Sequence, residues 1–243
     1  MNNCMGFGIA PSDGNDAGDI AYKRDLLIIG VCGGTGSGKT GVCKRLVSVL
    51  PRTVRSQILS MDCFYKPLTE QQQQDALASK YDFDHPNALD IDYFERCVKG
   101  IKARQTIAIK DYDFVTHKLT ADVKHIYIGA QLDVLFVEGI HIFQRPQLFD
   151  IKIFVDVDDD ERLIRRILRD TKTRGRTLQQ VIDEWQRFVK PNFDTIISST
   201  KRFADLIVPH GAHNEISIDM IKDHLKKRIG FEEISPMIRK TSI

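Results

Sequence analysis

The sequence predicts an α/β fold built on a doubly wound parallel β-sheet. Short apolar runs rich in Ile and Val alternate with longer amphipathic stretches, which is the order expected when helices cover both faces of a parallel sheet. The runs are almost continuously apolar, as strands are when both of their faces are buried. A glycine-rich segment joins the first run to the first amphipathic stretch, where such sheets place their ligand-binding loops.

The individual elements follow from these patterns. The predicted strands are Leu26–Val31, Gln57–Met61, Leu132–Val137, Ile151–Val157 and Asp205–Val208. The predicted helices are Lys39–Leu50, Ile91–Lys102, Glu161–Arg169, Thr177–Val189 and Ile216–Arg228. The stretch Gln105–Ile128 breaks the alternation, because two short β-like pieces flank a polar centre. It is predicted to be a β-hairpin insertion over about residues 104–128.

The length of 243 residues suits one large α/β domain with a small insertion. That domain is expected over residues 25–229. Residues 1–24 are rich in Gly, Asn, Asp and Ala without periodicity, so they are predicted to be a disordered leader. Residues 230–243 are predicted to be a flexible tail.

The composition argues against several classes of partner. A net charge of +2 is too small to indicate a nucleic acid or a membrane surface. No apolar run approaches the ~18 residues of a membrane span, and no signal peptide is visible at the N-terminus. The five cysteines are loosely spaced and form no CxxC pair, which argues against disulfides and against a metal site built on sulfur. A cytoplasmic protein with free thiols is therefore expected.

A phosphate-binding loop is the strongest motif in the chain. Residues 33–40 read GGTGSGKT and match the pattern G-x-x-x-x-G-K-[ST]. Glycines let successive backbone N–H groups point at phosphate oxygens, Lys39 supplies positive charge to the β- and γ-phosphates, and the Thr40 hydroxyl ligates Mg²⁺. The loop follows a predicted strand and opens a predicted helix, as a P-loop NTPase-type fold requires. The expected nucleotide contacts are Gly33, Gly34, Thr35, Gly36, Ser37, Gly38, Lys39 and Thr40.

Two acids follow predicted strands at the carboxyl edge of the sheet. Asp62 comes directly after the second strand, where a carboxylate can orient a substrate hydroxyl and accept its proton. Glu138 ends the third strand, where an acid is placed to hold Mg²⁺ through water. The alternatives are a turn or cap residue for Asp62 and a solvated strand end for Glu138. GTPases usually carry an NKxD motif to read the base, and this chain has none.

An arginine-rich segment follows the fourth strand. Residues 161–176 hold six arginines, and Leu163, Ile164, Ile167 and Leu168 are expected to keep one helix face apolar. The sharper hypothesis is an Arg-rich lid over about residues 161–189 that closes on ATP and neutralises the transferring phosphoryl group. The alternative is a solvated basic helix or a patch for polyanions, with some arginines serving solubility alone.

Taken together, the longer motifs resemble the uridine–cytidine kinase family. They are MDCFY at 61–65, YDFDHP at 81–86, YDFVTH at 112–117, FVEGI at 136–140, RRILRD at 165–170, RGR at 174–176, FVKP at 188–191 and ADLIVPHGAHN at 204–214. They fall in the family's order and span nearly all of residues 25–229, and YDFDHP with YDFVTH is far more specific than the P-loop. The resemblance implies a P-loop kinase that phosphorylates uridine and cytidine at the 5′-hydroxyl.

The resemblance also implies roles for single residues. Asp62 is similar to the family's catalytic base, with Lys39 and Arg169 as further catalytic groups, and Thr40, Asp62 and Glu138 would form the Mg²⁺ environment. Arg174 and His213 would contact the phosphate donor, which is ATP or GTP. The implied nucleoside contacts are Tyr65, Asp84, Tyr112, Phe114, His117, Ile140, Arg166, Arg176 and Glu184. A homotetramer is implied as well.

For several of these residues, a structural role without ligand binding is an alternative when the residue is considered alone. In this set Asp84 would hold the ribose hydroxyls with Arg166 as its partner, and His117 would bond the 4-position of the pyrimidine. Alone, Asp84 would be a turn residue and His117 an ordinary polar residue. A tyrosine–phenylalanine pair in a hairpin is commonly cross-strand packing.

Two positions depart from the family pattern. Glu184 stands where the family usually has glutamine, and residues 209–213 read PHGAH where arginine and aspartate are common. The first change bears on the preference or affinity for the nucleoside, and the second on the preference for the phosphate donor. The alternatives that remain are a phosphoribulokinase or pantothenate kinase type of enzyme, and a nucleotide-binding regulator without turnover. A nucleic-acid-binding role would rest on the arginines alone.

Overall fold

The structure is a computed structural model that describes residues 25–230. The predicted leader, and the tail beyond Gly230, lie outside the described residues. Within this range, no helix combines the length and the apolar composition needed to cross a membrane.

A five-stranded parallel sheet forms the centre of the domain, in the order β2-β5-β1-β6-β7. The strands are β1 (Leu27–Gly33), β2 (Ser56–Ser60), β5 (Val134–Gly139), β6 (Ile151–Asp156) and β7 (Leu206–Pro209). All five predicted strands are confirmed to within two residues at each end. Because β1 lies in the middle, the loop that follows it is flanked by the carboxyl ends of β5 and β6.

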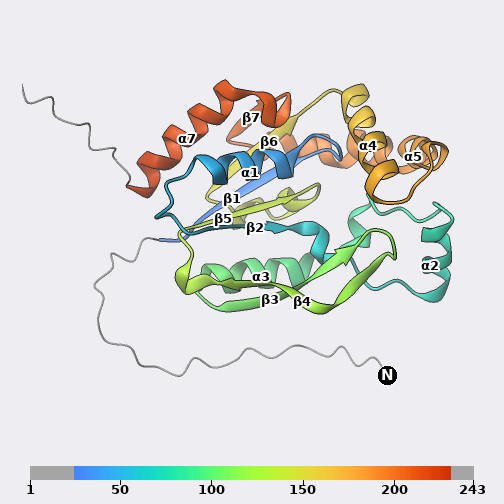
Figure 1. Ribbon diagram of the computed structural model, residues 1–243, viewed down its shortest axis with the longest axis horizontal. Helices are drawn as coiled ribbons and strands as arrows, with labels where there is room; N and C mark the ends of the chain where they lie inside the picture. The colour runs from blue at the N-terminus through green and yellow to red at the C-terminus, as the bar shows by residue number, and fades with distance from the viewer. Residues whose placement is uncertain (1–24, 231–243) are drawn as a thin grey trace, which may run out of the picture.

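Helices cover both faces of the sheet, as predicted (Figure 1). On one face, α1 (Lys39–Val49) and α7 (Glu215–Ile229) pack on the odd-numbered residues of β1, such as Ile29. On the other face, α3 (Ile91–Lys102) packs on the even-numbered residues, such as Ile28. Two separate cores result, because side chains on a strand alternate between its faces.

The predicted hairpin is confirmed and forms a two-stranded sheet of its own. Its strands, β3 (Thr106–Asp113) and β4 (Lys118–Ile128), are longer than the pieces visible in the sequence. The hairpin lies on the α3 side of the molecule (Figure 1). Tyr127 anchors it beside β2, since its hydroxyl donates to the backbone oxygen of Ile58 at 2.9 Å.

The arginine-rich segment is helical, and its buried face is charged. α4 (Asp159–Thr173) buries Arg162, Arg166 and Asp170, whereas Ile164 and Leu168 of the predicted apolar face are more than half exposed. The apolar face is therefore not the one that packs on the domain. The buried charges pair with one another and with the loops beneath, so polar contacts hold α4 in place.

The remaining helical segments differ from the prediction in extent. Thr177 forms a capping box with Gln180 at the start of α5 (Leu178–Glu184). The helical path then continues through π-turns at Trp185–Val189 and Phe193–Ile197, joined by α6 (Lys190–Asn192), to a 3-10 stretch at Ser198–Phe203. The sequence reading missed α2 (Glu70–Leu77), a polar helix with only Ala76 buried. Hydrophobic periodicity is absent from such a helix.

Candidate active site

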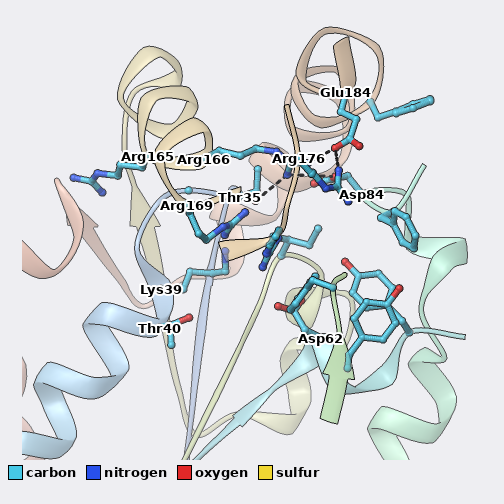
Figure 2. A pocket seen from close by; sticks show the side chains of 18 of the residues that line it. Thr35, Lys39, Thr40, Asp62, Asp84, Arg165, Arg166, Arg169, Arg176 and Glu184 are labelled. Atoms are coloured by element: carbon cyan, nitrogen blue, oxygen red, sulfur yellow. Dashed lines mark hydrogen bonds and ion pairs between the residues drawn. The ribbon is translucent and has the colours of Figure 1, made fainter. Parts of the chain in front are cut away.

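One cavity of about 310 Å³ joins the phosphate loop, the hairpin and the arginine-rich helices. Most of the predicted site residues line it, although they come from elements far apart in the sequence. Figure 2 shows Lys39 and Thr40 on one side, Asp62 below, and Arg166, Arg176 and Glu184 above. Of the predicted set, Gly33, Gly34, Ser37 and His213 are not in the lining.

The phosphate loop is closely supported by α4. A Cβ atom at Gly34 would stand 2.3 Å from the Arg162 guanidinium, and one at Gly36 would stand 2.3 Å from the Arg162 backbone oxygen. Gly36 also has a φ of +77°, which favours glycine. The Arg162 side chain is fully buried, donates to the Val157 oxygen at 3.1 Å and lies 3.7 Å from the Phe193 ring centre. Arg162 is therefore not one of the arginines that serve solubility alone.

Lys39 is in place to meet phosphate oxygens. Its side chain is buried and its Nζ donates to the backbone oxygen of Gly34 at 3.0 Å, so the ammonium group lies over the loop. Gly38, at the N-cap of α1, has a φ of +89°. The first N–H groups of α1 and the ammonium thus face the same region, which is suited to an anion.

Thr40, Asp62 and Glu138 bring oxygen atoms together at the carboxyl edge of the sheet. The Thr40 hydroxyl donates to Glu138 Oε1 at 3.0 Å. Burial raises the pKa of the Glu138 carboxyl, and the charge of Asp62 raises it further. Asp62 lies in a 3-10 turn, η1 (Met61–Phe64), just beyond β2, and Glu138 is the penultimate residue of β5. Both acids therefore lie at the carboxyl ends of their strands, as predicted.

Aromatic side chains from the hairpin and from residues 81–83 form the other end of the cavity. The Tyr112 ring lies 4.7 Å from Tyr65 and 5.2 Å from Phe114. The His117 ring stacks on Phe83 at 4.8 Å, with 15° between the planes. Among the described residues, neither the Tyr112 hydroxyl nor His117 Nδ1 has a hydrogen-bond partner, although both are buried. Buried polar atoms without partners mark positions where a ligand can bond.

The arginines above the cavity converge on Asp170, whose side chain is fully buried. Asp170 pairs with Arg166 at 3.4 Å, Arg169 at 2.7 Å and Arg174 at 3.4 Å. Burial opposes its charge, but the hydrogen bond and charge of Arg169 and the other arginines outweigh this and lower the pKa of the carboxyl. The Arg174 guanidinium also lies 3.6 Å from the Phe114 ring centre, which links the arginine cluster to the hairpin.

Glu184 acts as a counter-ion in this structure. It binds Arg166 Nη2 at 2.9 Å and also pairs with Arg176. Glutamine at this position would keep the geometry but not the charge. Arg166 also reaches Asp84, but at 3.9 Å the predicted pairing of these two is the looser contact. Burial raises the pKa of the Asp84 carboxyl, and Arg166 lowers it.

The loop at residues 209–213 lies beside the phosphate loop. A Cβ atom at Gly211 would be 2.7 Å from the Ser37 backbone oxygen, and Arg165 donates to the oxygens of both Ser37 and His210. His213 ends the short 3-10 turn Gly211–His213 and is exposed.

Sequence reasoning missed several residues of the cavity wall. Tyr81, Phe83 and Phe188 line it, and none of them was assigned a role. Tyr81 and Phe83 belong to the same YDFDHP motif as Asp84, so three of its six residues line the cavity. The motif as a whole was the signal that could have identified the two aromatic residues.

His141 supports the Asp84 segment from outside the lining. Its Nε2 lies 2.6 Å from the Asp84 backbone oxygen, so this nitrogen carries the proton and donates. Burial lowers the pKa of the imidazole from 6.5 to about 4, against the opposing effect of this hydrogen bond. In mildly acidic solution His141 binds a proton in the unfolded chain but not in the folded one, which favours the unfolded state.

We expect a pH dependence of stability from this residue. The contribution of His141 to the free energy of unfolding is complete above pH ~6.5 and is lost as the pH falls towards ~4. The loss amounts to at most about 3 kcal/mol. Urea unfolding of the wild type and of His141→Gln across this range measures it. The difference in unfolding free energy between the two should shrink on acidification. A constant difference would contradict the assignment.

Comparison with known proteins gives the family. The model of the phosphoribulokinase / uridine kinase family matches residues 28–217. The chain belongs to this family. It is 38% identical to uridine-cytidine kinase 2-B of Danio rerio over 239 residues, which covers 90% of each chain. It is 42% identical to uridine-cytidine kinase-like 1 of Mus musculus over 218 residues, or 88% of this chain.

The family match is consistent with the fold and the P-loop. This chain spans only 39% of the mouse relative and 40% of uridine-cytidine kinase A of Dictyostelium discoideum. Among solved structures, the phosphoribulokinase of Rhodobacter spheroides superposes with a TM-score of 0.59 at 18% identity. The alignment covers 76% of this chain and 70% of that one. This supports the P-loop kinase fold, which the family shares.

Proposed function

We propose that this family member transfers the γ-phosphate of ATP to the 5′-hydroxyl of uridine and cytidine, giving UMP and CMP. The observation that carries the proposal is the single cavity, which joins the phosphate loop, Asp62 and an aromatic end with unpaired polar atoms. The family relatives of known name point to the same nucleosides. We also propose that the protein works in the cytoplasm as a homotetramer, as the family resemblance implies.

The nucleoside fits the hairpin end of the cavity. Tyr65, Phe114 and Ile140 provide apolar surface for the base, and aromatic faces favour stacking. The unpaired Tyr112 hydroxyl and His117 Nδ1 are the groups for the base edge. A neutral imidazole donates from one nitrogen and accepts at the other, which suits both the uracil carbonyl and the cytosine amino group. Asp84 is the acceptor for the ribose hydroxyls, with Arg166, Arg176 and Glu184 around it.

The phosphate donor fits the opposite end. Backbone N–H groups of residues 33–40 and Lys39 would hold the β- and γ-phosphates, and Arg169 and Arg174 stand on the far side of the cavity. Thr40, Asp62 and Glu138 form an oxygen donor set suited to Mg²⁺. Burial, and after it the charge of Asp62, raise the pKa of the Glu138 carboxyl, and a bound cation would favour its charged form. When bound, Mg²⁺ supplies charge neutralisation between phosphate oxygens.

The proposed mechanism depends on positioning. Asp62 accepts a hydrogen bond from the 5′-hydroxyl, turns the hydroxyl oxygen towards the γ-phosphorus and takes its proton. The bond from this oxygen to the γ-phosphorus forms as the bond from the γ-phosphorus to the β–γ bridging oxygen breaks, and ADP leaves. The transition state is loose and carries its charge on the equatorial oxygens. Lys39 and Arg169 stabilise that charge. We propose that the segment of about residues 161–189, which holds most of α4 and all of α5, acts as a lid that excludes water from the reaction.

A coupled ADP-release assay tests the function. The acceptors are uridine, cytidine, thymidine, adenosine, ribulose 5-phosphate and pantothenate, each with ATP and Mg²⁺. We expect turnover with uridine and cytidine alone. Turnover confined to another acceptor would keep the kinase fold and overturn the nucleoside assignment. Tight ATP binding without turnover on any acceptor would indicate a regulator.

His117 gives a sharper test of base recognition. Its φ is +55°, a conformation that asparagine also tolerates, so His117→Asn removes the imidazole with little backbone strain. Loss of one hydrogen bond predicts a change of up to about tenfold in the uridine-to-cytidine ratio of kcat/KM. The KM for ATP should stay within about twofold of the wild type. Val115→Ala, at an exposed position of the same turn, is the control. An unchanged ratio in His117→Asn would remove His117 from base recognition.

A further inference from the structure

A cluster of three potential metal ligands lies at the base of the hairpin, outside the cavity lining. Cys63 Sγ is 3.9 Å from Asp111 Oδ1, and His125 Nε2 is 3.9 Å from Asp111 Oδ2. All three ligand atoms lie within 4.8 Å of one another. They come from η1, β3 and β4, so the cluster exists only when the hairpin is docked.

The backbone of the hairpin turns these side chains towards η1. Side chains alternate along a strand, so Asp111, two residues after Ile109 in β3, belongs to the same face as Ile109. The register shifts between Ile109 and Tyr112 add residues to the β4 side of the pair. His125 lies directly opposite Ile109, which is buried, so both belong to the inner face of the hairpin. The imidazole is therefore a polar group on a face that otherwise packs on the core.

We propose that Cys63, Asp111 and His125 bind a divalent transition metal of the zinc class. Thiolate, imidazole and carboxylate together are a donor set for Zn²⁺, whereas Mg²⁺ prefers oxygen alone. Ligand atoms in a tetrahedral zinc site lie roughly 3.3–3.8 Å apart. Here they lie within 4.8 Å of one another, so movements of up to about one ångström would complete the geometry. Coordination forms the metal–sulfur bond and releases the thiol proton to solvent.

Access and coordination number follow from the exposure of the ligands. The Asp111 and His125 side chains are 50% and 43% exposed, while Cys63 is 6% exposed at the base of the cluster. Metal can therefore enter from solvent on the hairpin side. Three protein ligands leave a fourth position for water. The spacing in the sequence did not indicate a site, because the cysteine and the histidine belong to different elements.

A bound ion would join the hairpin to the turn that carries Asp62. Asp62 directly precedes Cys63 in η1, and Tyr112 directly follows Asp111 in β3. The ion would thus connect a residue beside the reacting hydroxyl to a residue beside the base. The inference goes beyond the proposed function and does not depend on it, since it concerns metal binding alone.

Cobalt spectroscopy tests the site directly. Co²⁺ is titrated into the reduced full chain without an affinity tag, with excess Mg²⁺ present to compete at Thr40, Asp62 and Glu138. We expect one equivalent of Co²⁺ to give a sulfur-to-metal charge-transfer band and visible bands typical of tetrahedral cobalt, both abolished by Zn²⁺. The Cys97→Ala variant, which removes another buried thiol, should behave as the wild type.

Variants decide whether these three residues are the ligands. Cys63→Ser should abolish the charge-transfer band, and His125→Ala should weaken Zn²⁺ binding by at least about tenfold. His125 is half-exposed, so His125→Ala is expected to fold even if Cys63→Ser folds poorly. Thermal unfolding shows whether each variant is folded. No charge-transfer band in the wild type, or a band that persists in Cys63→Ser, would overturn the proposal. Unchanged Zn²⁺ affinity in His125→Ala would also overturn it.

Discussion

Asp62→Asn is expected to lower kcat by a factor on the order of 10²–10⁴, with little change in ATP binding. Asparagine keeps the size and the hydrogen-bonding reach of the side chain but cannot take the proton of the 5′-hydroxyl. The side chain faces the cavity from η1, across from the arginines on α4 (Figure 2). Lys39 and the phosphate loop, which we propose to bind the triphosphate, lie on other elements, so ATP binding is expected to be retained.

Initial rates with saturating uridine and separate ATP titration by fluorescence measure the two quantities. Asp92→Asn is the matched control, because Asp92 is an exposed acid on α3 that pairs with Arg145 far from the cavity. It should have wild-type kcat. A near-normal kcat in Asp62→Asn would show that another group, or the substrate phosphate itself, takes the proton.

Asp170→Asn is expected to reduce both stability and turnover. Asp170 is fully buried and pairs with Arg166, Arg169 and Arg174, and the amide would leave these cations without their shared counter-charge. Removal of one partner from a buried ion pair costs about 3–5 kcal/mol. Glu184 still pairs with Arg166, so we expect the lower end of this range. The kcat should fall as well, because Arg169 and Arg174 lose the group that aims them at the cavity.

Urea unfolding and steady-state kinetics measure the two effects of Asp170→Asn. Asp160→Asn is the control on the same helix, since Asp160 is exposed in the first turn and should cost about 1 kcal/mol or less. Saturating ATP and uridine should restore part of the stability, because ligand binds only the folded state. An unfolding free energy within about 0.5 kcal/mol of the wild type would contradict the role of Asp170 as the centre of the cluster.

Much of the architecture was predictable because its signals are local. A strand buried on both faces is apolar throughout, and β1, β5 and β6 each appear in the sequence as such a run. The phosphate loop was equally clear, because its glycines, lysine and threonine meet requirements set within eight residues. These elements fix the position of the cavity, which is why most predicted site residues line it.

The errors came from contacts between distant parts of the chain. α4 has its apolar side chains Ile164 and Leu168 exposed, because the buried side carries Arg162 against the phosphate loop and Asp170 among the arginines. Hydrophobic periodicity cannot identify a buried helix face whose contacts are made by charged side chains. The role of Glu184 as a counter-ion was also hidden, since its partners lie 18 and 8 residues away on other turns.

The separate sheet of the hairpin has a consequence for how this enzyme family can change. β3 and β4 hydrogen-bond to each other, and the five parallel strands that carry the phosphate loop form a different sheet. Mutations in the hairpin that spare its core contacts, Ile109 and Tyr127, can therefore accumulate without breaking hydrogen bonds of the sheet that carries the phosphate loop. Selection for a new acceptor can act on one inserted segment while the phosphoryl-transfer apparatus is inherited intact. Changes in the hairpin would alter the cavity wall at Tyr112, Phe114 and His117 and leave the wall formed by Asp84 and the arginines in place.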